Sequence, residues 1–186
     1  MMQSFPAPGA GFGRIVHIAY LVPDIDAAMA HWTAQAGVGP WLCFRNIDMA
    51  ATYEGKPIRL RIHEGLSYVG DMQIQLVQSL NDPSEETPYA AMLRAGRYGM
   101  HHVACISPDI ARDVARAEAQ GWEAACRMED ADGHRYVYCR SRAMPEVWWE
   151  FLEEFPALTQ MYRDGIAASA AWDGGNPVNN IDYGVR

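Results

Sequence analysis

Residues 17–28 read HIAYLVPDIDAA, and residues 102–113 read HVACISPDIARD. The histidine, the alanine two residues after it and the Pro-Asp-Ile step all return 85 residues later, which indicates two copies of one supersecondary unit. In each copy a short apolar run leads to Pro-Asp and then to apolar positions at helical spacing, a pattern that predicts strand, turn and helix. Asp24 and Asp109 are the expected N-caps, because a carboxylate there accepts a hydrogen bond from a free amide of the first turn.

Three further strand-like segments follow each predicted helix. They are Trp41–Asn46, Ile58–His63 and Ser67–Gln78 in the first half, and Glu123–Met128, His134–Cys139 and Val147–Leu152 in the second. Each half is therefore predicted to be a βαβββ module, the first over residues 13–80 and the second over residues 98–155.

The remaining segments are expected to complete a single domain, residues 1–186. A short helix is expected at Thr87–Ala95, between the two modules. The C-terminal part, residues 156–186, is predicted to hold a helix at Leu158–Ala170 and a loose tail from residue 172 onward.

Composition and charge exclude several classes of protein. With 49% hydrophobic and 20% charged residues, the chain has the composition of a soluble folded protein rather than a disordered one. The formal net charge is −8, and no run of lysine or arginine offers a surface for a phosphate backbone, so nucleic acid is not an expected partner.

The cysteines and the N-terminal residues indicate a compartment. Four cysteines lie far apart without a C-x-x-C pair, which favours reduced, buried thiols over a disulfide framework. Residues 1–14 lack the basic and apolar regions of a signal peptide, and no stretch is apolar enough to span a bilayer. We expect a cytoplasmic protein with no membrane partner.

Four polar residues occupy matching strand positions in the two halves. His17 and His102 start the repeat, and Gln75 and Glu150 lie between apolar neighbours in the last strand of each half. Because alternate residues of a strand share a face, pairing of the halves about a pseudo-twofold axis would bring all four together. Two imidazoles, a carboxylate and an amide oxygen suit a divalent transition metal with positions left open for substrate.

These motifs give the sequence its resemblance to a known family. HIAYLVPD at 17–24, IQLV at 74–77, GMHHVA at 99–104 and WEFL at 149–152 resemble the vicinal oxygen chelate superfamily, which includes glyoxalase I, methylmalonyl-CoA epimerase and extradiol dioxygenases. TPYAAML at 87–93 is similar to the epimerase and glyoxalase branch. The resemblance implies an α+β fold in which paired βαβββ modules form a cup-shaped mixed sheet.

The resemblance also implies a metal site and a reaction. It makes His17, Gln75, His102 and Glu150 the ligands of one divalent ion: cobalt, nickel, zinc, manganese or iron. The leading expectation is an isomerase, epimerase or lyase that removes a proton next to a carbonyl through a metal-stabilised enolate. A homodimer is expected, as in many relatives.

The base for this reaction is left open by the sequence. In the epimerase it is a glutamate well upstream of the glutamine, but the matching stretch here, Ile58–Arg61, has no carboxylate; Glu54 lies before it and His63 and Glu64 after it. The catalytic candidates are Glu150, which could leave the metal and act as base as in glyoxalase I, His63, and Tyr138 as a proton donor from a neighbouring strand.

The expected substrate is small and apolar or aromatic. Three large side chains, Trp41, Phe44 and Trp148, are the candidates for contact with it. Two alternatives remain open: an iron-dependent extradiol-type dioxygenase that uses His17, His102 and Glu150, and a non-catalytic binding protein of the same fold.

Overall fold

The computed structural model describes residues 11–184 of the chain. The first half holds β1 (His17–Leu21), α1 (Ile25–Ala36), β2 (Trp41–Tyr53), β3 (Lys56–Val69) and β4 (Met72–Ser79). After α2 (Ala90–Arg94), the second half holds β5 (Gly99–Ser107), α3 (Ile110–Ala119), β6 (Trp122–Glu129), β7 (Arg135–Ser141) and β8 (Trp148–Glu153). The C-terminal part adds α4 (Pro156–Ala171) and β9 (Val178–Asp182).

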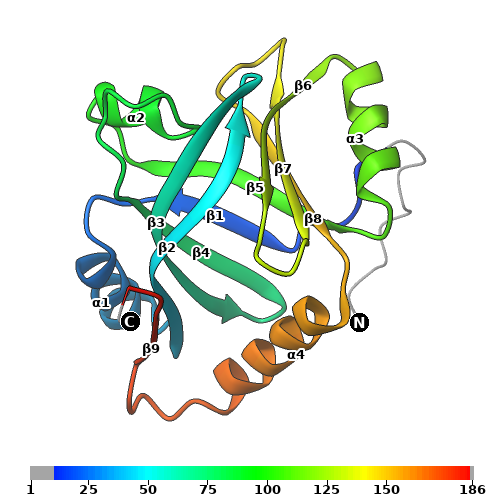
Figure 1. The fold of residues 1–186 in the computed structure, drawn as a ribbon. Coiled ribbons are helices and arrows are strands. Elements are labelled where there is room, and N and C mark those ends of the chain that lie inside the picture. The colour runs from blue at the N-terminus through cyan, green and yellow to red at the C-terminus, as the bar shows by residue number, and fades with distance from the viewer. Residues whose placement is uncertain (1–10, 185–186) are drawn as a thin grey trace.

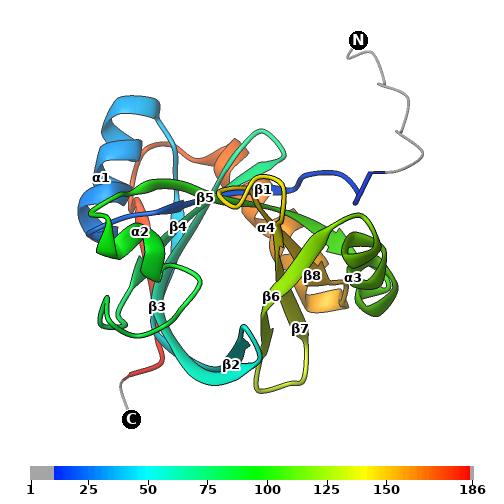
Figure 2. The same cartoon turned by 90° about the horizontal axis from the view of Figure 1, so that it is seen from above.

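All described strands belong to one mixed sheet. Their order is β3-β4-β1-β5-β8-β7-β6-β2-β9, and β2 also pairs with β3, so the curved sheet closes into a barrel (Figures 1 and 2). The first strands of the two halves, β1 and β5, pair antiparallel and so join one half to the other. Helices α1 and α3 pack outside the barrel, and α4 runs across one end of it (Figure 1). The expected fold class, α+β with a cup-shaped mixed sheet and a C-terminal helix, is confirmed.

The repeated turn has the expected chemistry in both copies. The Asp24 side chain accepts a hydrogen bond from the Ala27 amide at 2.8 Å, and the Asp109 side chain accepts one from the Arg112 amide at 3.1 Å. Each carboxylate therefore satisfies a free donor of the first helical turn, and both N-cap predictions are confirmed.

One predicted strand was wrong. The run Ser67–Gln78 is not a single strand, because β3 ends at Val69 and β4 begins at Met72. Gly70 has φ 61°, a left-handed conformation that a two-residue hairpin uses and that glycine adopts without strain. An apolar pattern that continues on both sides of the turn hid it in the sequence.

The C-terminal part is more ordered than predicted. Within the tail expected to be loose, β9 pairs in parallel with β2, with Trp41 opposite Val178 and Arg45 opposite Asp182. The tail thereby covers the free edge of β2. Residues 185 and 186 lie outside the described part of the chain. None of the helices within residues 11–184 is both long and apolar enough to cross a bilayer.

Candidate metal centre

Three of the predicted ligands meet inside the barrel. His17 on β1, His102 on β5 and Glu150 on β8 come from three neighbouring strands and point to the same face, because His17 and Glu150 both lie opposite Ala104 and His102 is two residues before it. His17 Nε2 is 3.2 Å from His102 Nε2, and Glu150 Oε2 is 3.1 Å from the first and 3.2 Å from the second. All three side chains are buried.

The hydrogen bonds of His101 fix the tautomer of His102. His101 Nε2 lies 3.0 Å from the Pro88 carbonyl oxygen, which can only accept, so the proton of His101 is on Nε2. Burial, together with the neighbouring His102, lowers the pKa of His101 to about 3, so its Nδ1 is a bare acceptor. This Nδ1 lies 2.9 Å from His102 Nδ1, which therefore donates to it and leaves the lone pair of His102 Nε2 facing Glu150.

Glu150 supplies the negative charge of the cluster. Burial by itself would raise the pKa of Glu150, but hydrogen bonds and positive charge from His102 and His17 in their protonated forms would outweigh it and lower the pKa to about 2. Where the Nε2 atoms are bare, a bound cation would stabilise the carboxylate instead. Burial also lowers the pKa of His102, so its neutral form is favoured. An ionised carboxylate and a bare imidazole nitrogen meet here, a donor set that fits a divalent cation.

Gln75 lies on the same face of the sheet. It is opposite Ala19 on β1, two residues from His17. Its amide nitrogen donates to Glu64 Oε1, and its amide oxygen is buried without a hydrogen-bond partner among the described residues. An unpaired buried carbonyl oxygen is unfavourable by about 1–3 kcal/mol, so this atom has the free lone pairs that a metal ligand requires.

Glu64 is a site residue that the sequence reasoning did not select. Burial raises the pKa of Glu64 to about 7, with Glu150 contributing in the same direction and the Gln75 hydrogen bond opposing both. The alternation Leu60, Ile62, Glu64, with apolar residues in line with an acid, was the signal that could have placed it on the inner face. The predicted strand ended one residue too early to include it.

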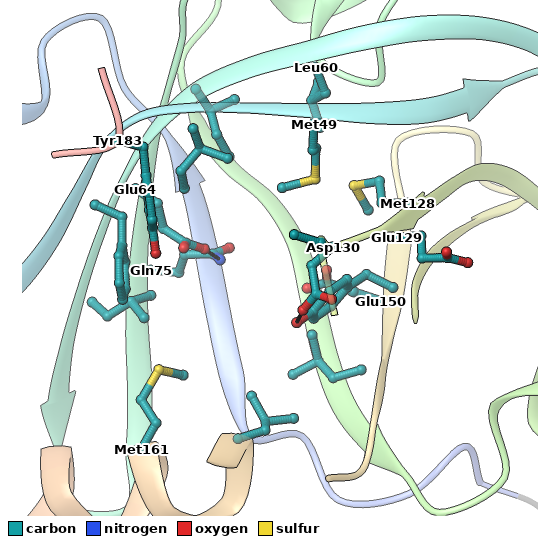
Figure 3. Close-up of a pocket in the computed structure, with 18 of the residues that line it drawn as sticks. Met49, Leu60, Glu64, Gln75, Met128, Glu129, Asp130, Glu150, Met161 and Tyr183 are labelled. Atoms are coloured by element: carbon teal, nitrogen blue, oxygen red, sulfur yellow. Dashed lines mark hydrogen bonds between the residues drawn. The ribbon is translucent and has the colours of Figure 1, made fainter. Parts of the chain in front are cut away.

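A cavity of about 1150 Å³ opens in front of these side chains, lined by His17, Glu64, Gln75 and Glu150 among others. Figure 3 shows Glu64 and Gln75 together at one wall of the cavity and Glu150 at another. Much of the remaining lining is apolar, including Met49, Leu60, Leu66, Met128, Leu152 and Met161.

Of the other predicted site residues, some line the cavity and some do not. Tyr138 lines the cavity, and its hydroxyl is 3.0 Å from that of Tyr89. Phe44 also lines it and stacks on Tyr183, with ring centroids 6.2 Å apart. His63 does not line it: as a neighbour of Glu64 in β3 it faces the other way, and its Nδ1 accepts a hydrogen bond from the Asn46 amide.

The two tryptophans are also outside the cavity lining. Trp41 packs in the core beneath α1, and its indole nitrogen donates to Thr33 Oγ1. Trp148 stacks on His101, with ring centroids 5.4 Å apart, and so packs behind the residue that hydrogen-bonds to His102. Both residues were predicted to contact the substrate, but neither Trp41 nor Trp148 lines the cavity.

The sequence of this chain matches a known protein family. Residues 16–138 match the model of the Glyoxalase/Bleomycin resistance protein/Dioxygenase superfamily. The chain belongs to this superfamily. The resemblance to vicinal oxygen chelate proteins, drawn from the repeated motifs, is thereby confirmed. No curated protein matches the chain in sequence.

Solved structures share the architecture of this superfamily member. A hypothetical protein, BH1468 from Bacillus halodurans C-125, has a TM-score of 0.53 and 19% identity, over 77% of this chain and 95% of its own. Methylmalonyl-CoA epimerase from Mycobacterium tuberculosis has a TM-score of 0.51 and 20% identity, over 78% of this chain and 91% of its own. At these identities the likeness is one of fold.

Proposed function

We propose that this superfamily member is a metal-dependent isomerase, epimerase or lyase that removes a proton from the carbon next to a carbonyl group of an uncharged, apolar substrate. One divalent ion would be held by His17, Gln75, His102 and Glu150. The observation that carries the proposal is the meeting of three ligand atoms within one buried cluster at a cavity wall. The unpartnered oxygen of Gln75 supports the fourth ligand.

The reaction needs an electrophile and a base. A bound divalent ion stabilises the negative charge that develops on a substrate oxygen as the proton leaves. For the base we propose Glu64, which faces the cavity and lies outside the three-atom cluster. Gln75 engages Oε1 of Glu64, and among the described residues no hydrogen bond reaches Oε2, so that oxygen is free to accept a proton.

Glu150 and Tyr138 are less suited to be the base. Glu150 is the one carboxylate of the three-atom cluster, so its release would leave a bound ion without that negatively charged ligand. Burial, with the charge of Glu150 nearby, raises the pKa of Tyr138 well above its ordinary value. Tyr138 therefore stays protonated, and it can give up a proton but cannot act as the base.

The residues that line the cavity favour an uncharged substrate. Arg59 is the one lysine or arginine among the described residues that line it, and Asp48 is paired with it at 2.9 Å. Carboxylates dominate the rest of the charged lining: Glu129, Asp130, Asp132 and Asp182 in addition to the inner pair. A negative mouth disfavours polyanionic substrates such as coenzyme A esters, and apolar walls favour an aliphatic or aromatic body.

The test separates metal binding from proton removal. The protein loaded with Co²⁺ or Zn²⁺ is incubated in D₂O with 2-hydroxyacetophenone or phenylacetone, and loss of the proton signal next to the carbonyl is followed by NMR. We expect exchange with the wild-type protein, loss of exchange with retained metal in Glu64→Gln, and loss of both in Glu150→Gln. Glu129→Gln, a carboxylate at the mouth, is the matched control and should exchange as wild type does.

Two results would overturn the proposal. One is a wild-type protein that takes up no divalent metal from metal-supplemented buffer. The other is equal exchange in wild type and Glu64→Gln, which would remove the base from the scheme.

One observation favours a second candidate, the extradiol-type dioxygenase. The cluster formed by His17, His102 and Glu150 is complete without Gln75, and two histidines with one carboxylate are the ligand set of many non-haem iron oxygenases. Oxygen uptake by the Fe²⁺-loaded protein with 2,3-dihydroxybiphenyl, and a yellow ring-fission product, would favour this reaction over proton removal.

A further inference from the structure

The helix α4 reaches the proposed metal centre through one side chain. Tyr162 is buried, and its hydroxyl oxygen lies 3.1 Å from His17 Nδ1, the ring nitrogen that points away from the cluster. The same hydroxyl lies 3.2 Å from Oε1 of Gln73. Tyr162 therefore joins a ligand on β1 to a side chain on β4, across 145 residues of sequence from His17.

The direction of these hydrogen bonds follows from the partners. Gln73 Nε2 donates to the Tyr68 hydroxyl at 2.6 Å, which turns Gln73 Oε1, an acceptor, toward Tyr162. The single proton of the Tyr162 hydroxyl is used in that bond. The hydroxyl must then accept from His17, so the proton of His17 is on Nδ1 and the lone pair of Nε2 faces His102 and Glu150.

From this geometry we propose that Tyr162 is a positioning residue of the metal centre, which holds His17 in the Nδ1–H tautomer and fixes its ring so that Nε2 can bind a cation. The inference rests on the proposed metal site. It makes α4 part of that site rather than a cover over the barrel. The contact comes from outside the segment matched by the superfamily model, which ends at residue 138.

The sequence of α4 explains how the helix packs so closely against β3. Gly165, one turn after Tyr162, has no side chain, and a β-carbon there would overlap the ring of Tyr68 on β3. The rings of Tyr68 and Tyr162 pack edge to face, with centroids 5.9 Å apart. Leu158 is buried in the same cluster. Close approach at Gly165 thus sets the depth at which the Tyr162 hydroxyl meets His17.

The test compares two variants that each remove the hydroxyl of one buried tyrosine. Tyr162→Phe removes the acceptor of His17, whereas Tyr89→Phe removes a hydroxyl that pairs with Tyr138 and contacts neither His17 nor Gln73. Zn²⁺ affinity is measured by competition with a chromophoric chelator. Loss of a hydrogen bond to a metal-binding histidine typically lowers metal affinity by about 10- to 100-fold, so we expect that loss for Tyr162→Phe and less than about threefold for Tyr89→Phe.

A second readout follows His17 itself. In the Zn²⁺-loaded wild type, the imidazole Nδ1–H proton of His17 should give a downfield, slowly exchanging NMR signal because Tyr162 accepts from it. This signal should be lost or exchange rapidly in Tyr162→Phe and persist in Tyr89→Phe. Thermal unfolding of the metal-free variants controls for a general packing defect, which would affect both.

The outcomes separate this inference from the proposed function. If the wild type binds Zn²⁺ and Tyr162→Phe binds it equally well with an unchanged His17 signal, the positioning role is wrong and the metal site stands. If the wild type binds no Zn²⁺, the metal site fails and the positioning role fails with it. Equal loss of affinity in both variants would also overturn the role, because it would point to packing alone.

Discussion

The amide nitrogen of Gln75 on β4 donates a hydrogen bond to Glu64 on β3, and this contact leaves the amide oxygen of Gln75 buried without a partner in the described part of the chain. One carboxylate thus orients the amide while remaining available to the cavity. The pairing of β3 with β4, in which Leu66 lies opposite Gln75, places the two side chains diagonally on one face.

Replacing Gln75 tests whether its oxygen is a ligand. Gln75→Ala should weaken divalent metal binding by at least about tenfold, equivalent to about 1.4 kcal/mol, because the unpartnered oxygen is removed. Gln78→Ala is the control, since Gln78 is on the same strand but accepts from the Ile25 amide on the helix side. Unchanged affinity in Gln75→Ala, measured by chelator competition, would favour a three-ligand site and with it the dioxygenase alternative.

Metal removal should lower the thermal stability of the protein. A ligand at one hundred times its dissociation constant stabilises the folded state by about 2.7 kcal/mol. For a chain of this length that corresponds to a rise in Tm of roughly 5–11 °C. Calorimetry with Zn²⁺ and then with excess EDTA measures the shift, and His102→Ala should abolish it. An identical Tm in both buffers would contradict a site at these residues.

The four cysteines should be inert in the folded protein. All four are buried and free. Burial raises the pKa of the Cys126 and Cys139 thiols to about 12 and that of the Cys43 and Cys105 thiols to about 11. An acid with a raised pKa is less ionised at any pH below it, so very little thiolate exists at pH 8. A thiol reagent should label none of the four natively and all of them in denaturant. Rapid native labelling would speak against the packing of the sheet.

Gly165 in α4 should contribute to the stability of the fold despite the low helix propensity of glycine. An alanine in an exposed helix position gains about 1 kcal/mol over glycine. At Gly165 the added methyl group would meet the Tyr68 ring, and such overpacking typically destabilises by about 1–3 kcal/mol. Tyr68 cannot move away easily because its hydroxyl is bound by Gln73. We therefore expect Gly165→Ala to lower the free energy of unfolding in urea titrations.

The control for this substitution is Ala168→Gly, on an exposed turn of the same helix. It measures the propensity difference without the clash. A Gly165→Ala protein that is more stable than the wild type by that same amount would show that α4 does not press against β3 as described.

The sequence was sufficient for the parts of the fold that repeat locally. The duplicated segment predicted the strand, turn and helix of both halves, and Asp24 and Asp109 cap their helices as expected. The same repeat placed His17, Gln75, His102 and Glu150 at equivalent strand positions, and they lie on one face of the sheet. Period-two alternation and duplication are properties of the sequence, so they can be recognised from the sequence alone.

Three contacts were decided only by the tertiary structure. Glu64 joins the site because of the register of β3 against β4. Tyr162 joins it because α4 crosses one end of the barrel, and β9 forms because the chain returns along β2. Each depends on where two distant segments come to lie, which is set by packing and strand register over the whole domain. Local sequence periods determine which face a side chain occupies, but they carry no information about the partner that the face will meet.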